Sequence, residues 1–149
     1  MPTQIDLQND ESLSGLPDQK DFLTWVDAAL MQDYDSLEQT IRVVGEAESR
    51  ALNSQYRQTD APTNVLSFAS ENRYLDYDCL GDLVICAAIV EQEAKQQDKL
   101  LQAHWAHMVV HGMLHLQSYD HQNAIEADKM ESLEAKILTT LGYTNPYNN

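Results

Sequence analysis

All five histidines of the 149-residue chain lie between positions 104 and 121. Three of them, His111, His115 and His121, are spaced four and then six positions apart. Residues four apart on a helix lie on one face, one turn apart, so the first two imidazoles can reach one metal ion. The third can join them only if the chain leaves the helix after about residue 117 and turns back. The spacing therefore requires a helix followed by a turn, and three protein ligands leave a fourth position open, as in a catalytic zinc site.

The alternative interpretation is that the histidines bind no metal and form a pH-sensitive stripe of polar side chains along one helix. A lone histidine on an apolar helix face is usually a hydrogen-bonded core residue, and a pair four apart is weak evidence for a metal. The third histidine matters more, because H-x3-H-x5-H is the ligand spacing of a large group of zinc hydrolases. His104 and His107 extend the stripe. His107 could line the site or support a ligand, and His104 lies too far away to bind the same ion. For both, a polar wall or a surface position is the simpler interpretation.

The residue after the first histidine argues against a peptidase. Metalloproteases with this spacing carry a glutamate there as general base. In this chain the position is Gly112, so peptide hydrolysis would lack its proton acceptor. The pattern favours a metal hydrolase with a different substrate.

Composition indicates one domain over residues 1–149, without a membrane partner. Hydrophobic residues make up 43% and charged residues 22% of the chain, and no run of about 18 apolar residues could form a membrane span. The first ten residues lack a signal-peptide pattern. Cys79 and Cys86 are seven apart and form no CxxC motif, which is typical of reduced thiols and predicts a cytoplasmic protein.

The net charge argues against a general nucleic-acid binder. The chain has 24 acidic and 9 basic residues, a net charge of −15, whereas phosphate contacts need clustered lysine and arginine. A nuclease whose substrate is delivered by a partner remains possible, and a bound metal would make the local field less negative.

The pattern of apolar residues predicts an α+β fold, a single domain with a mixed four-stranded sheet packed with about five helices. Strands are expected at Gln4–Gln8, Thr40–Val44, Asn64–Phe68 and Gly81–Cys86. Helices are expected at Pro17–Met31, Glu46–Tyr56, Ala87–Gln97, Leu101–Gln117 and Ala124–Leu141. Loops are expected at Gln58–Pro62 and Ala69–Leu80.

The run from His111 to His121 resembles the signature of the YbeY family, bacterial metal-dependent endoribonucleases of ribosomal RNA maturation. Further stretches agree in order, and the resemblance covers about residues 40 to 147. These stretches are Glu48–Arg57, Pro62–Phe68, Gly81–Cys86 and Leu141–Tyr147. One departure is Ser118, where the family has glycine as the chain leaves the helix.

The resemblance implies one zinc ion on His111, His115 and His121, on a helix and the following turn, and a functional arginine at Arg57. It implies a single-strand-specific endoribonuclease of 16S ribosomal RNA 3′-end maturation and ribosome quality control. The expected partners are ribosomal RNA, the small ribosomal subunit and assembly factors such as a ribosome-associated GTPase.

The expected chemistry is phosphodiester cleavage. Three neutral imidazoles leave the full +2 charge on zinc, which lowers the pKa of coordinated water toward about 7. Either water or the ribose 2′-hydroxyl could be the nucleophile. The planar fork of Arg57 suits two phosphate oxygens, and the alternative is a surface arginine at a helix end. Two other functions stay open: a zinc-containing ribosome-assembly factor without catalysis, and a metal hydrolase of a peptide or small phosphoester. Cys79 or Cys86 as a fourth ligand would favour the former.

Overall fold

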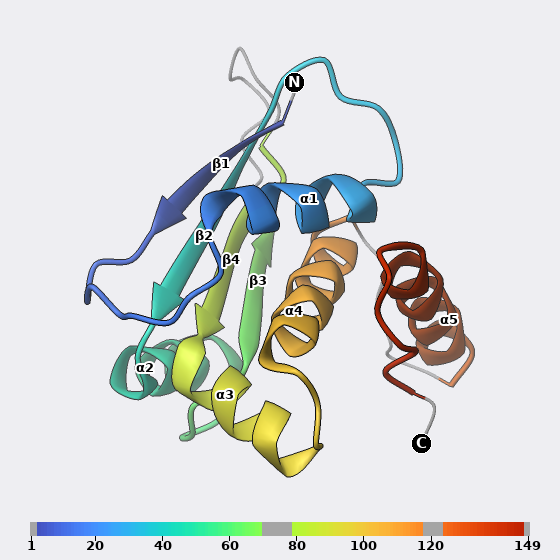
Figure 1. The fold of residues 1–149 in the computed structure, drawn as a ribbon. Coiled ribbons are helices and arrows are strands. Elements are labelled where there is room, and N and C mark those ends of the chain that lie inside the picture. The colour runs from blue at the N-terminus through green and yellow to red at the C-terminus, as the bar shows by residue number, and fades with distance from the viewer. Residues whose placement is uncertain (1–2, 70–78, 118–123, 148–149) are drawn as a thin grey trace.

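A computed structural model of the chain describes residues 3–69, 79–117 and 124–147. These residues form the expected α+β unit, a four-stranded mixed sheet with five helices around it (Figure 1). Helices α1, α4 and α5 pack on one side of the sheet (Figure 1). Within the described residues, no helix combines the length and the apolar character that a membrane crossing requires.

The sheet has the strand order β1-β2-β4-β3, so β3 lies at one edge. Strands β1, β2 and β4 run parallel, and β3 pairs antiparallel with β4. The strands are β1 Thr3–Gln8, β2 Leu37–Val44, β3 Val65–Ala69 and β4 Gly81–Cys86. The helices are α1 Gln19–Ala29, α2 Glu46–Arg57, α3 Ala87–Gln96, α4 Leu101–Leu116 and α5 Ala124–Thr140.

All nine elements predicted from the sequence are present, and their ends shift for local reasons. Helix α1 begins two residues after the expected Pro17, because Asp18 caps it. The side chain of Asp18 accepts a hydrogen bond from the backbone N–H of Asp21. The carboxylate of Asp21 in turn accepts a hydrogen bond from the backbone N–H of Asp18. Of the expected loop Ala69–Leu80, Ala69 belongs to β3 and residues 70–78 lie outside the described part of the chain.

Strand β2 begins three residues earlier than the β-branched run predicted. Gln39 faces the interior and is fully buried, a polar residue that the hydrophobic pattern does not anticipate. Its side-chain amide donates to the carbonyl of Gly81 at the start of β4, 2.9 Å away. This bond partly compensates the burial, and Leu37 two residues earlier joins the core.

Each face of the sheet has its own apolar cluster. Alternate side chains point to opposite faces, so in β4 Leu83 and Ile85 pack against the large cluster that includes α1, α4 and α5. Val84 and Cys86 belong to a smaller cluster on the other face, against which Leu52 of α2 and Ile89 of α3 pack. Helices α2 and α4 therefore lie on opposite faces of the sheet (Figure 1).

Gly112 brings α4 close to the sheet. A Cβ atom at this position would lie 2.7 Å from Cδ2 of Leu83 and 3.3 Å from Cγ2 of Val65. Leu83 is fully buried, so its methyl group has little space into which to move. The position after the first histidine thus faces the sheet and has no room for a side chain.

We predict that Gly112→Val destabilises the fold by about 1–3 kcal/mol, because overpacking outweighs the few tenths gained in helix propensity. Urea denaturation measures the change. The control is Gln102→Val at an exposed position of the same helix, which is expected to shift stability by about 0.5 kcal/mol or less. Equal effects of the two substitutions would contradict the close packing of α4 on β4.

Candidate metal centre

Helix α4 carries four histidines on one stripe and is otherwise mostly apolar. Most of its residues from position 104 onward are buried, because α1, α3, α5 and the sheet surround it. His104 and His107 are buried, whereas His111 and His115 are half-buried. Buried imidazoles need hydrogen-bond partners, and these come from other elements.

His104 is paired with Glu93 of α3. Its Nε2 atom lies 2.9 Å from Oε1 of Glu93, and the side-chain amide of Asn64 donates to the same carboxylate at 3.1 Å. Burial lowers the pKa of His104 below its usual value, and the carboxylate of Glu93 opposes this shift without cancelling it. His104 is therefore a core histidine with a carboxylate partner. Of the two positions considered from the sequence, a polar wall or the surface, burial excludes the surface for His104, and the prediction that it stands apart from the metal ligands is compatible with this geometry.

Glu134 of α5 is the centre of a second hydrogen-bonded group. Its side chain is fully buried and lies between two imidazoles of α4. Nε2 of His107 is 3.1 Å from Oε2, and Nδ1 of His111 contacts Oε1. Tyr147, near the C-terminus, donates its hydroxyl proton to Oε2. One carboxylate thus joins α4, α5 and the C-terminal segment.

These bonds determine the charge of the group. Burial by itself would raise the pKa of Glu134, but hydrogen bonds from His107, His111 and Tyr147 outweigh it and lower the pKa from 4.5 to about 2. The phenol of Tyr147 is affected in the opposite sense. Loss of hydration and then the hydrogen bond to Glu134 raise its pKa above the usual value. At neutral pH the carboxylate is ionised and the phenol keeps its proton.

His111 also faces His115, one turn further along α4. The two Nε2 atoms lie 3.1 Å apart, while Nδ1 of His111 points to Glu134. The side chain of His111 is 23% exposed, so solvent reaches this part of the stripe. The structure therefore brings together two of the three histidines expected as ligands. His121, the third, and Ser118 lie outside the described residues.

Three residues of this region could hold a metal ion. One ligand atom each from His107, His111 and Glu134 lies within 4.8 Å of the others. Sequence reasoning placed His107 beside the site and missed Glu134. A signal was present, because Glu134 occurs on the buried face of α5 between Met130, four positions earlier, and Leu138, four later. A carboxylate on an apolar stripe requires buried partners.

Neither cysteine belongs to this group. Cys86 ends β4 and packs with Val44 and Leu66 on the opposite face of the sheet. Burial raises the pKa of its thiol. The fourth-ligand role considered for Cys86 in a structural zinc site is therefore excluded by its position.

Arg57, the expected functional arginine, is the exposed last residue of α2 and is not in the group around Glu134. The edge strand β3 lies between the two: Tyr56 packs on Phe68 from one face, and Ser67 donates to the carbonyl of Gly112 on the other. Arg57 thus lies near the sheet edge that α4 covers from the opposite side. Its exposure fits both a phosphate contact and a surface arginine, so its role stays a prediction.

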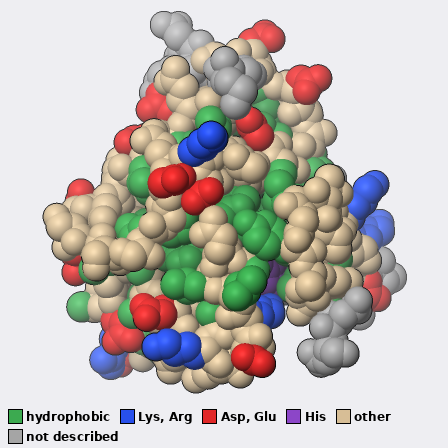
Figure 2. Space-filling view, in the orientation of Figure 1, with side chains coloured by type: hydrophobic (Ala, Val, Ile, Leu, Met, Phe, Trp, Pro, Cys, Tyr) green, Lys and Arg blue, Asp and Glu red, His purple; other side chains and the backbone are tan. Residues whose placement is uncertain are grey.

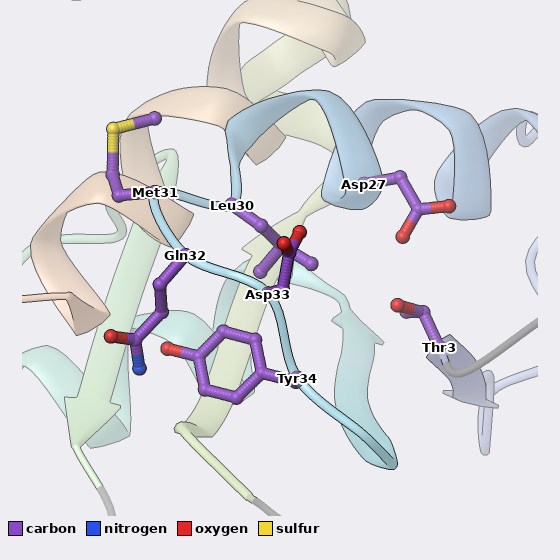
Figure 3. Close-up of a pocket in the computed structure, with 7 residues that line it drawn as sticks. All are labelled: Thr3, Asp27, Leu30, Met31, Gln32, Asp33 and Tyr34. Atoms are coloured by element: carbon purple, nitrogen blue, oxygen red, sulfur yellow. The ribbon is translucent and has the colours of Figure 1, made fainter.

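Two hollows of the structure differ in how they lie relative to the histidine stripe. The larger, about 540 Å³, lies between the start of β1 and the end of α1. Its carboxylates, Asp27 and Asp33, point to separate parts of the space (Figure 3), so they do not converge as metal ligands. A second cavity, about 310 Å³, is bounded by His107, Lys99 and the C-terminal segment. In the space-filling view a small area of histidine surface is visible at the margin of the apolar centre of the face shown (Figure 2). Of these two cavities, the second adjoins the group around Glu134, because His107 lines it.

Fold and site together define an α+β protein with a buried histidine–glutamate group that could bind a metal. Comparison with known proteins identifies the family. The sequence profile described as "Endoribonuclease YbeY" matches residues 5–142. The fold is similar to the solution structure of TM1509 from Thermotoga maritima, with a TM-score of 0.55 and 22% identity over 98% of this chain and 100% of that one. The chain belongs to the YbeY endoribonuclease family.

Family membership confirms the expected class of function. It implies an endoribonuclease in ribosomal RNA processing, a hydrolase of phosphodiester bonds whose substrate is RNA. Because Gly112 faces Leu83, a metalloprotease glutamate would also have no space there. The structure thus gives a steric reason for the absence of that base.

Acid should destabilise the protein through His104. Its folded pKa lies below the unfolded value of 6.5, so its stabilising contribution is full above about pH 6.5 and is lost as the pH falls through the folded pKa. We predict that His104→Gln reduces the loss of unfolding free energy between about pH 7.5 and about pH 5.5, by at most about 1.4 kcal/mol per pH unit. Urea denaturation of chelator-treated protein at both pH values measures this. If the unfolding free energies of the parent and of His104→Gln fell equally between the two pH values, the loss of stability could not be assigned to His104.

Proposed function

We propose that the protein is a zinc-dependent, single-strand-specific endoribonuclease that matures the 3′ end of 16S ribosomal RNA and acts in ribosome quality control. The observation that carries the proposal is the convergence of the Nε2 atoms of His111 and His115, 3.1 Å apart on a partly exposed part of α4. It occurs in a chain of an endoribonuclease family.

The donor set fits zinc. In a tetrahedral site with zinc–nitrogen bonds of about 2.0–2.1 Å, two ligand nitrogens lie about 3.3 Å apart, close to the separation of the two Nε2 atoms. His111 and His115 would hold one zinc ion, with His121 as the third ligand proposed from its spacing. An ion held by three neutral imidazoles supplies Lewis acidity for activating a nucleophile and for stabilising charge on phosphoryl oxygens.

Arg57 is the proposed phosphate-binding residue. Arg42 and Arg50 are already engaged in ion pairs with Glu48 and Asp60. Within the described part of the chain, no ion pair involves Arg57, so its guanidinium is available to an RNA phosphate. A planar guanidinium can contact two phosphate oxygens and stabilise the charge that develops there.

The surface supports delivery of RNA by partners. With a net charge of −15, the chain attracts free RNA poorly, and on the face in Figure 2 the described basic side chains are scattered among acidic ones. We therefore propose that the small ribosomal subunit and assembly factors such as a ribosome-associated GTPase present the substrate, in the cytoplasm. No feature favours the assembly factor without catalysis or the hydrolase of another substrate over this function.

Zinc content separates the two possible ligand sets. We predict about one zinc per chain, lost in His111→Ala, His115→Ala or His121→Ala, because three ligands are needed to retain it. His107→Ala is expected to keep the metal. Metal analysis of the purified variants measures this. Loss of zinc from His107→Ala with full retention in His115→Ala would instead assign the ion to His107, His111 and Glu134.

Cleavage of RNA tests Arg57. We predict that Arg57→Ala binds zinc normally and cleaves a single-stranded RNA carrying the 16S 3′-terminal sequence about 10²–10³-fold more slowly, the usual loss for one transition-state contact. Single-turnover kinetics of the zinc-loaded protein measures the rate. Arg50→Ala is the control, because Arg50 lies on the same helix but is paired with Asp60. Similar rates for the two variants would leave Arg57 a surface arginine.

A further inference from the structure

Glu134 has no access to substrate. Its side chain is fully buried, and its oxygen atoms face His107, His111 and Tyr147. RNA held at the surface cannot reach it. Any contribution of this carboxylate to the reaction must therefore pass through the residues that it contacts.

The contact with His111 decides which nitrogen of that ring carries the proton. An ionised carboxylate only accepts hydrogen bonds, so Nδ1 of His111 must be the N–H that faces Oε1 of Glu134. A neutral imidazole has a single N–H. In this tautomer Nε2 of His111 carries no proton, and its lone pair faces Nε2 of His115, 3.1 Å away. That tautomer is the one a metal shared by the two Nε2 atoms requires.

The same contacts oppose a role for Glu134 as a metal ligand. If Glu134 bound an ion together with Nε2 of His107 and Nδ1 of His111, both rings would lose the protons that these nitrogens donate to the carboxylate. Oε2 also accepts from Tyr147. Three donors from α4 and the C-terminal segment thus hold the carboxylate in one orientation, and none of them needs a metal to do so.

We propose that Glu134 is a positioning residue of the zinc site, which keeps the proton of His111 on Nδ1 so that Nε2 is presented to the metal. His107 and Tyr147 hold the carboxylate in place. The inference rests on the zinc site proposed above. It adds α5 and the C-terminal segment to a site whose expected ligands all lie on α4 and the residues after it.

Zinc affinity, measured by competition with a chelator, tests the proposal without reference to RNA cleavage. Glutamine has the shape of glutamate but offers one acceptor oxygen and an N–H donor, so it cannot accept from both imidazoles. Glu134→Gln is expected to bind one zinc about 10–100-fold more weakly than the parent chain. Glu131→Gln, an exposed substitution three residues earlier on α5, is the matched control and should stay within about twofold of the parent.

Two further measurements distinguish positioning from ligation. With cobalt(II) in place of zinc, Glu134→Gln should keep the visible absorption spectrum of the parent, because the ligand set is unchanged. A shifted spectrum would make Glu134 a ligand and overturn the proposal, as would an affinity within about twofold of the parent. If Glu134→Gln does not fold, nitrogen-15 NMR of histidine-labelled, metal-free parent decides: a proton on Nε2 of His111 overturns the proposal. Tight zinc binding without RNA cleavage would contradict only the proposed function.

Discussion

Helix α4 must bury histidines, and that requirement organises much of the molecule. An imidazole removed from water needs a partner for its polar atoms, and a lone helix cannot supply one. Glu93 of α3 meets His104, and Glu134 of α5 meets both His107 and His111. The helices that cover α4 therefore provide specific hydrogen bonds as well as apolar contact. Loss of one carboxylate would leave buried polar groups unpaired, which costs more than an ordinary surface hydrogen bond is worth.

The stripe divides into a buried part and an accessible part. His104 and His107 lie deep in the protein and interact with carboxylates, whereas His111 and His115 are half-buried. His111 belongs to both parts, with one nitrogen on Glu134 and the other facing His115. A ring held in this way from the interior is preorganised at its outer nitrogen, which lowers the ordering cost of binding an ion there.

The sheet separates the two proposed halves of the reactive region. The histidines project from α4 on one face, and Arg57 ends α2 on the other. Edge strand β3 lies between them and contacts both helices, through Ser67 on one side and Phe68 on the other. Gly112 permits the close approach of α4 that this arrangement needs, because a side chain there would collide with Leu83.

The sequence by itself was enough to predict the α+β class, the order of the nine elements and the helix that carries the histidines. These features depend on local periodicity, such as the buried run of β4 and the apolar face of α1. This periodicity is a property of each segment and does not depend on which elements pack beside it. The pairing of His111 with His115 was equally accessible, because a four-residue spacing on a helix places two side chains together whatever surrounds them. The roles of Glu93, Glu134 and Tyr147 were decided only by the tertiary structure. They lie 11, 23 and 40 positions from their histidine partners, and hydrogen bonds between elements depend on how those elements dock, which no local pattern in the chain encodes.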